Sequence, residues 1–184
     1  MRTLWLRDRA LDLDRVRLLG VLNLTPDSFS DGGRYLDPER ALERAREMVA
    51  EGADILDLGA ESTRPGAAPV PVEEEKRRLL PVLEAVLSLG VPVSVDTRKP
   101  EVAEEALKLG AHLLNDVTGL RDERMVALAA RHGVAAVVMH MPVPDPATMM
   151  AHARYRDVVA EVKAFLEAQA KRALSAGVPQ VVLD

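Results

Sequence analysis

Polar side chains that could bind a ligand stand where apolar segments of this sequence stop. Five residues follow apolar runs in this way: Asn23, Asp96, Asn115, His140 and Asp184. A carboxylate accepts two parallel donors and a carboxamide both donates and accepts, so these groups suit the polar edge of a small molecule. Taken singly, each could instead cap a turn or a helix. If the runs are neighbouring parallel strands, the five side chains should meet at one rim.

Other kinds of catalytic site find little support in the sequence. No Ser-His-Asp or Cys-His set indicates a protein nucleophile, and no pair of histidines has the spacing of a zinc site. We expect His112, His132 and His152 at the surface or at helix ends. Asparagine occurs only at positions 23 and 115. Because scarce amides are typical of heat-adapted proteins, the two that remain are expected to have specific roles.

Short apolar runs alternate with amphipathic segments from Arg17 onward. Strands are expected at 18–22, 54–58, 91–95, 113–114, 135–139 and 181–183. Helices are expected at 38–51, 72–89, 100–109, 121–132 and 155–176. Asp37 and Pro38 provide an N-cap and a first helical residue, and Gly110 and Gly133 follow helix ends. Residues 3–13 are expected to form a short hairpin that turns near Asp8 and Arg9.

This alternation predicts parallel strands covered by helices. The repeat of roughly 30 residues is that of a (β/α)8 (TIM) barrel. A doubly wound open sheet is the alternative, and the barrel is preferred because no Gly-x-Gly-x-x-Gly turn follows the first strand. We expect 1–184 to be a single barrel domain whose hairpin caps the N-terminal mouth. Since six strands cannot close a barrel, we expect the chain to cover about five and a half βα units, with the C-terminal units missing.

The composition narrows the class of partner. The chain of 184 residues has a net charge of -5 and 3% aromatic residues, which argues against a basic or base-stacking nucleic-acid surface. No apolar run approaches the roughly 20 residues of a bilayer span, and no signal peptide is evident at the start. The absence of cysteine excludes disulfides and thiolate metal sites and fits a cytoplasmic protein.

Two long motifs identify a family resemblance. The sequence GVLNLTPDSFSDGG at 20–33 and the sequence GAESTRPG at 59–66 resemble the two signatures of dihydropteroate synthases. The shorter motifs SVDT at 94–97, LNDV at 114–117 and MHM at 139–141 are similar to later strand ends of that family, in the same order. The resemblance extends from Arg17 to Asp184. It implies a pterin-binding barrel that joins a pterin diphosphate to 4-aminobenzoate in folate synthesis and releases diphosphate.

The resemblance also implies roles for individual residues. Asp96, Asn115 and Asp184 would hold the pterin, and Val117 and Met139 would pack on its ring, although a plain core role suits those two equally. Asn23 would contact a Mg²⁺ ion that arrives with the diphosphate. Four residues would come from two long loops: Thr63 as a contact to the pterin diphosphate, Arg64 beside the leaving diphosphate, and Phe29 and Pro65 against the benzoate ring. Arg64 and Asp96 are the expected catalytic residues of this transferase, which the resemblance implies to be a homodimer.

Two other function classes stay open at this point. A pterin-binding methyltransferase that passes a methyl group to a corrinoid would share the barrel and the pocket. A non-catalytic ligand-binding barrel is the other alternative. The loops 25–30 and 62–66 favour the synthase. Because the family takes further diphosphate-binding residues from later strands, we expect the 184-residue segment alone to be inactive.

Overall fold

The computed structural model describes residues 2–25, 37–62, 68–143 and 148–184. Its strands are β1 (Thr3–Leu6), β2 (Arg9–Asp12), β3 (Leu19–Asn23), β4 (Ile55–Gly59), β5 (Val93–Asp96), β6 (Leu113–Asp116), β7 (Ala135–Val138) and β8 (Val181–Leu183). Its helices are α2 (Pro38–Ala50), α3 (Val72–Leu87), α4 (Pro100–Leu109), α5 (Glu123–His132), α6 (Met149–His152) and α7 (Val158–Ser175). The order of strands and helices follows the predicted repeat.

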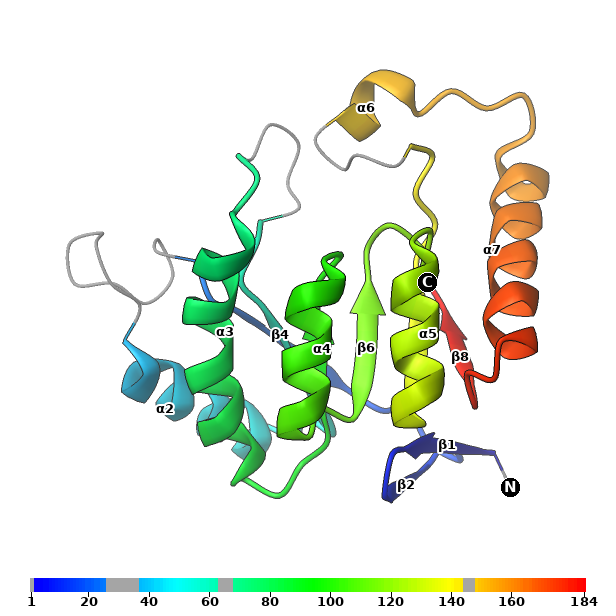
Figure 1. Ribbon diagram of the computed structural model, residues 1–184. Coiled ribbons are helices and arrows are strands. Elements are labelled where there is room, and N and C mark those ends of the chain that lie inside the picture. Colours follow the sequence, from blue (N-terminus) through cyan, green and yellow to red (C-terminus); the bar gives the residue numbers. More distant parts are fainter. Residues whose placement is uncertain (1, 26–36, 63–67, 144–147) are drawn as a thin grey trace.

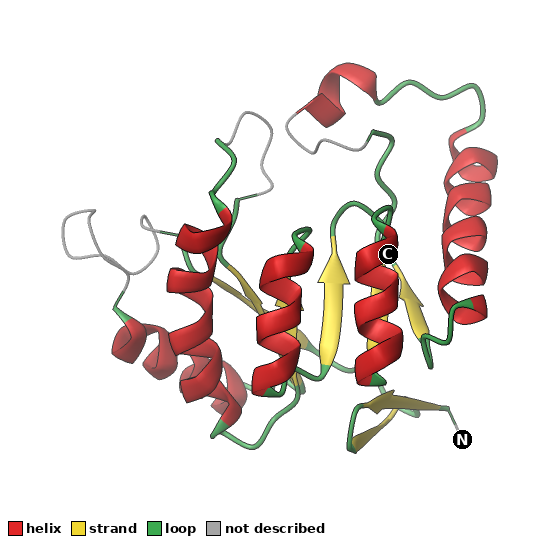
Figure 2. Cartoon of the chain, in the orientation of Figure 1, coloured by secondary structure: helices red, strands yellow, loops and turns green. Residues whose placement is uncertain are grey.

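Strands β3 to β8 form one parallel sheet in which spatial order follows chain order. Helices α3, α4 and α5 lie side by side across one face of this sheet (Figures 1 and 2). A doubly wound sheet would reverse its strand order at a switch point and cover both faces with helices. The sequential order is that of a (β/α)8 barrel, so the predicted fold class is confirmed and the alternative is wrong.

Local sequence signals set most helix ends. The Asp37 carboxylate accepts a hydrogen bond from the Glu39 amide at 3.0 Å, and Pro38 occupies the first turn of α2. Helix α5 begins two residues later than predicted, at Glu123, because Asp122 is the N-cap and accepts from the Arg124 amide at 2.9 Å. Gly133 ends α5 in the left-handed region, with φ of 63°. The short helix α6 was not predicted.

Two apolar clusters lie on opposite faces of the sheet. The larger one fills the space between the sheet and the helices and contains one register row of strand residues: Leu22, Leu58, Val95, Leu114 and Ala136. The smaller one lies on the inner face, where Leu4 and Leu6 of the hairpin pack with strand residues Ile55, Leu113, Ala135 and Val137. Because strand side chains alternate between faces, this pattern identifies every inward-pointing position.

The hairpin β1–β2 is fixed at the end of the sheet where the strands begin (Figure 1). The Gln180 side chain accepts from the Trp5 amide at 2.6 Å and donates to the Thr3 carbonyl at 3.0 Å. The Arg7 guanidinium donates to the carbonyl of Leu107, in the last turn of α4, and to the carbonyl of Ala111, two residues beyond the end of that helix. The predicted hairpin and its place at the N-terminal mouth are therefore confirmed, with the turn at residues 7–8 rather than 8–9.

Candidate active site

Three of the predicted site residues share one register row on the inner face. Across the sheet this row contains Asn23, Gly59, Asp96, Asn115, Val137 and Val182. Asn23, Asp96 and Asn115 come from three different strands, and only Gly59, which has no side chain, separates Asn23 from Asp96. A Cβ at Gly59 would lie 3.3 Å from Asp96 Oδ2, so the Asp96 carboxylate leans over this glycine. The sheet therefore collects the amide and carboxylate groups at one rim.

Asp184 and Met139 lie one step further out on the same face. They follow the register pair Val182 and Val137 by two residues each. The Asp184 amide donates to the Val138 carbonyl at 3.0 Å, and the Asp184 carbonyl accepts from the His140 amide at 2.9 Å. Asp184 is exposed and Met139 is half-buried. These two side chains extend the polar row towards solvent, at the C-terminal ends of β7 and β8.

Val117 lies two residues beyond Asn115 and is buried, with 6% of its surface exposed. It belongs to neither of the two apolar clusters. Its burial suits a plain core role and the predicted contact with a flat ring equally, so that contact stays a prediction.

Asp96 is held in surroundings that disfavour its charge. Burial, together with the negative charges of Asp57 and Asp116, raises the pKa of the Asp96 carboxyl to about 8. No described side chain forms a salt bridge with Asp96. A carboxyl group with so high a pKa gains most from a ligand that offers it hydrogen-bond donors or positive charge.

Asp57 is a buried carboxylate beside this row that was not predicted from the sequence. It lies inside β4 on the inner face, two residues before Gly59, and has only 3% of its surface exposed. The Asn115 side-chain amide donates to Asp57 Oδ2 at 3.1 Å, and burial raises the pKa of Asp57. The sequence does place this carboxylate in the middle of an apolar strand, which is unusual. It was missed because only residues at the ends of strands were considered as site residues.

An ion-pair network joins the segments that follow β4 and β5. Lys99 bridges two carboxylates, with Nζ 2.6 Å from Glu61 Oε2 and 2.5 Å from Glu75 Oε2. Glu75, fully buried in the first turn of α3, also accepts from the Thr97 hydroxyl at 2.6 Å. Because Thr97 directly follows Asp96, the network fixes the backbone next to that carboxylate.

Glu61 fastens a second connection within this network. Its carboxylate accepts from Arg98 Nε at 2.7 Å and from the Val70 backbone amide at 2.8 Å. Burial opposes ionisation of Glu61, but its bonds to Arg98 and Lys99 outweigh that effect and lower its pKa. The segment after β4 and the segment before α3 are thus both tied to the end of β5.

Four predicted site residues lie outside the described residues: Phe29, Thr63, Arg64 and Pro65. Their predicted roles stay predictions. Asn23 is described and exposed at the end of β3. Within the described ranges, no group of three or more His, Cys, Asp or Glu side chains could hold a metal ion. One amide oxygen nevertheless suits Mg²⁺ that is bound mainly through substrate phosphates and water.

The histidines divide differently from the prediction. His112 is 5% exposed, and its Nδ1 accepts from the Val93 amide at 3.2 Å, so its expected surface position is wrong. It lies three residues beyond the end of α4, and the turn of the hairpin covers it, with Asp8 Oδ1 3.7 Å from His112 Nε2. The His140 ring packs 5.2 Å from the Phe165 ring and 5.8 Å from the Tyr155 ring. These contacts lie towards α7 and favour packing over ligand binding.

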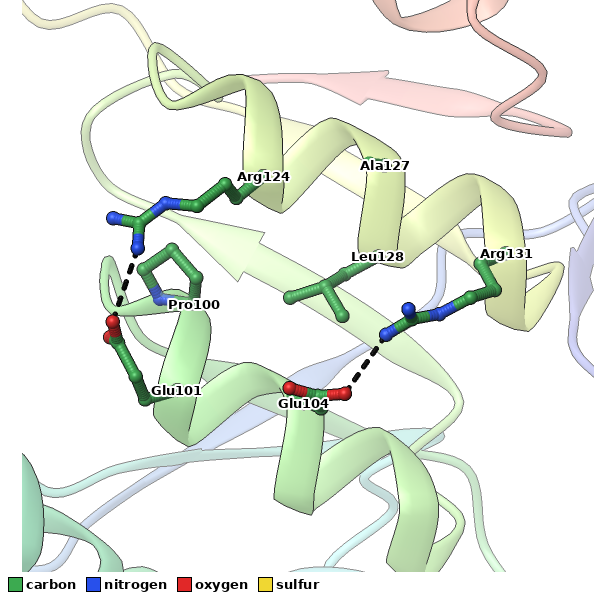
Figure 3. Close-up of a pocket in the computed structure, with 7 residues that line it drawn as sticks. All are labelled: Pro100, Glu101, Glu104, Arg124, Ala127, Leu128 and Arg131. Carbon is green, nitrogen blue, oxygen red and sulfur yellow. Dashed lines mark hydrogen bonds and ion pairs between the residues drawn. The ribbon is translucent and has the colours of Figure 1, made fainter.

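A separate groove lies between α4 and α5 (Figure 3). Two ion pairs cross it: Arg124 to Glu101 at 3.2 Å and Arg131 to Glu104 at 3.0 Å. Because its charged groups already pair with one another on the helical surface, the groove offers no group for chemistry and is distinct from the rim. Among the described residues, no helix has both the length and the apolar character needed to cross a membrane.

Comparison with known proteins identifies the family. A family model described as pterin binding enzyme matches residues 19–184. The structure of a dihydropteroate synthase from Thermus thermophilus in complex with 4-aminobenzoate is 91% identical, with a TM-score of 0.88, and the match covers 100% of this chain and 65% of that one. The structure of the Yersinia pestis synthase in a sulfonamide complex is 39% identical, with a TM-score of 0.90, over 100% of this chain and 67% of that one.

A curated relative gives the same result. The dihydropteroate synthase of Escherichia coli strain K12 is 44% identical over 176 residues, which is 95% of this chain and 62% of that protein. The chain thus spans less than two thirds of the Escherichia coli protein. The family model, the parallel sheet in chain order and the relatives agree. This chain therefore belongs to the pterin-binding enzyme family, within its dihydropteroate synthase branch.

Proposed function

We propose that the protein is a dihydropteroate synthase, which condenses (7,8-dihydropterin-6-yl)methyl diphosphate with 4-aminobenzoate to give 7,8-dihydropteroate and diphosphate. The observation that carries the proposal is the inner-face row of Asn23, Asp96 and Asn115, with Asp184 one step beyond. A row of acceptors at the rim of the sheet, half-buried at Asp96 and Asn115, suits a flat heterocycle that is rich in N–H donors.

The known complexes of relatives support this choice of substrates. The Thermus thermophilus synthase has been solved with 4-aminobenzoate and also with 6HMPPP, and the chain is 91% and 86% identical to the two structures. At such identity, the same ligands are the natural first choice for this protein. The corrinoid-dependent methyltransferase is less well supported, because the relatives compared above are synthases.

Within this proposal, the chain's residues act by binding and orienting. Asp96 and Asp184 accept the parallel donors of the pterin's amino group and ring N–H, and Asn115 supplies a further acceptor and a donor. Val117 and Met139 cover the ring face. Such a pocket rejects rings without those donors, because its own buried polar atoms would be left unpaired. Orientation of the methylene carbon towards the aniline nitrogen then supplies much of the rate.

The diphosphate end requires further groups. Asn23 would hold Mg²⁺ that is bound to the diphosphate, and the ion would neutralise charge on the leaving group. Arg64 would add positive charge there, Thr63 would contact the diphosphate, and Phe29 and Pro65 would pack against the benzoate ring. We further propose a cytoplasmic homodimer, which the lack of cysteine and the family resemblance support.

The test is a condensation assay on a protein of the full family length that contains this segment, because the 184-residue segment alone is expected to be inactive. The full-length protein should form dihydropteroate from the pterin diphosphate and 4-aminobenzoate, with activity lost to a chelator and restored by Mg²⁺. The control is the Asp96→Ala variant, which should lose most of the activity while staying folded. Methyl transfer to a corrinoid without condensation would establish the methyltransferase class in place of the synthase.

A further inference from the structure

Asp57 occupies the boundary between the apolar and polar parts of the inner face. Its register neighbours are Val21 on β3 and Ser94 on β5. Two residues earlier in β4 is Ile55, which packs in the small inner cluster with the hairpin. Two residues later is Gly59, in the row of Asp96 and Asn115. Asp57 therefore lies directly beneath the proposed pterin site and is itself almost inaccessible, with 3% exposed.

The contact between Asp57 and Asn115 orients an amide. Asn115 Nδ2 donates to Asp57 Oδ2 at 3.1 Å. An ionised carboxylate has only acceptors, so the opposite orientation would place the amide oxygen against a carboxylate oxygen. Asp57 thus turns the Asn115 Oδ1 atom away from itself. No described residue donates to that oxygen, which leaves it available to a ligand.

Two orphaned atoms mark the same place. Asp57 Oδ1 and Ser94 Oγ are both buried and have no hydrogen-bond partner among the described residues. The Ser94 hydroxyl is near enough to lower the pKa of Asp57 without making a regular hydrogen bond to it. Buried polar atoms without partners destabilise a fold. Asp116 Oδ2 is also buried without a partner among the described residues, so an orphaned oxygen alone does not indicate a binding role. The contact of Asp57 with Asn115 in the polar row is what indicates it.

A comparison with Asp116 shows that burial of a carboxylate does not by itself indicate a binding role. Asp116 is fully buried in β6 next to Asn115, and burial raises its pKa too. Its side chain lies on the helical face, where Oδ1 accepts from the Thr118 amide and hydroxyl at 2.8 Å each. Asp116 therefore fixes a turn, whereas Asp57 contacts a residue of the rim.

We propose that Asp57 is a positioning residue for ring recognition, which fixes the Asn115 amide so that its oxygen accepts from a ring N–H of the bound heterocycle. This role deepens the proposed function and rests on it for the identity of the ligand. Asp57 does not touch the ring in this arrangement. It acts through Asn115, and its effect on binding should disappear when Asn115 is removed.

The affinity of the intact protein for 6-hydroxymethylpterin, measured by calorimetry at about pH 9.5, tests the proposal. The charges of Asp57 and Asp116 help to raise the pKa of Asp96 to about 8, so Asp96 is ionised in every variant at this pH and its titration does not enter the comparison. Asp57→Ala should weaken binding about tenfold or more, the effect of losing one charge-assisted hydrogen bond. Asp57→Asn keeps an acceptor oxygen and should bind within about threefold of the original protein. The matched control is Asp116→Asn, a buried carboxylate on the other face, which should leave the affinity nearly unchanged.

A double-mutant cycle separates positioning from general damage to the fold. In an Asn115→Ala background, Asp57→Ala should cause no further loss of affinity. Equal losses in both backgrounds would show that Asp57 acts on stability alone, and the proposal would be wrong.

A measurement without ligand keeps this proposal separable from the proposed function. The side-chain NH₂ signals of Asn115 in a nitrogen-15 NMR spectrum should shift in Asp57→Ala and stay in place in Asp116→Asn. Unchanged signals in Asp57→Ala would refute the positioning role, whatever the protein binds. Failure of the unsubstituted protein to bind the pterin would refute the proposed function instead.

Discussion

At the scale of single residues, the inner face collects acidic groups that have few partners of opposite charge. Asp57 and Asp96 lie on neighbouring strands, and burial raises the pKa of both. By contrast, Glu61 pairs with Arg98 and Lys99, which lower its pKa. The ion-paired Glu61 therefore holds the structure together. Asp96 is left available to a ligand, and Asp57, which is almost inaccessible, contacts Asn115 beneath it.

The raised pKa of Asp96 predicts pH-dependent pterin binding. With a pKa of about 8, the Asp96 carboxyl in the free protein holds its proton at pH 7. A ligand that donates two hydrogen bonds favours the carboxylate, so binding at pH 7 should release about one proton. Affinity should rise about tenfold per pH unit up to about pH 8 and then level off.

Calorimetry at pH 7 in buffers of different ionisation enthalpy measures this proton release. The control is Asp96→Asn, in which the release should vanish together with most of the affinity. Binding heats that are independent of the buffer would show that Asp96 is not the titrating group.

The same carboxyl should lower stability as the pH rises. Between its unfolded pKa of 3.8 and its folded pKa of about 8, the native state keeps a proton that the unfolded state releases. The free energy of unfolding then falls by up to about 1.4 kcal/mol per pH unit. Asp96→Asn should therefore raise the melting temperature at pH 8 and leave it nearly unchanged at pH 4. The measurement is thermal unfolding of both proteins across this range.

Asp122 provides a comparison of opposite sign. The Arg124 side chain lowers the pKa of this helix N-cap, so its stabilisation is present at neutral pH and is lost as the pH falls through the lowered folded value. Asp122→Asn keeps the cap and should lower stability slightly at pH 7, by less than about 1 kcal/mol. Asp96→Asn should gain stability at pH 7, whereas Asp122→Asn should not. If Asp122→Asn also gained stability at pH 7, the opposite signs of the two pKa shifts would be contradicted.

At the scale of elements, the segments after β4 and β5 are tied together by buried charge. Lys99 contacts Glu61 and Glu75, and Glu75 also accepts from Thr97 next to Asp96. Loss of one partner in such a network leaves a buried charge without compensation. The ends of two strands and the start of α3 therefore depend on one lysine.

We predict that Lys99→Met lowers the free energy of unfolding by about 3–5 kcal/mol, because Glu75 is fully buried. Denaturant unfolding monitored by circular dichroism measures the change. The matched control is Lys76→Met, which removes an exposed pair with Glu73 on α3 and should cost less than about 1 kcal/mol. Similar losses in the two variants would show that the Lys99 network adds nothing beyond a surface pair.

Sequence patterns predicted the elements well because local chemistry sets them. Asp37, Pro38, Gly110 and Gly133 mark helix ends that the structure reproduces. The rim was predictable from polar residues after apolar runs, since parallel strands end on the same side.

Contacts between distant segments were not predictable in the same way. Asp57 was missed because inward and outward positions of a strand can be told apart only when its neighbours are known. His112 was misplaced because the hairpin, far away in sequence, covers it.

At the scale of the whole molecule, the inner face is divided along the strands. The hairpin residues Leu4 and Leu6 pack at one end with Ile55 and Leu113. The polar row lies towards the other end, where the strands finish (Figure 1). Apolar packing thus stabilises the fold at the N-terminal end, and ligand binding is left to the C-terminal end, as is usual in (β/α)8 enzymes.

This division predicts that stability and binding can be changed separately. Leu6 is fully buried in the inner cluster, so Leu6→Ala should cost about 2–5 kcal/mol of unfolding free energy through the cavity that it creates. The cluster contains none of the polar side chains of the rim, and of its buried residues only Val137 lies in their register row, so the pterin affinity of the folded variant should stay within about threefold of the original. Leu13→Ala, at a side chain that is 39% exposed, is the control and should change neither quantity much. Trp5, the single tryptophan, lies next to Leu6 and reports unfolding by fluorescence, and calorimetry well below the melting temperature reports affinity. A large loss of affinity in folded Leu6→Ala would show that the hairpin end and the rim are coupled, contrary to this division of the inner face.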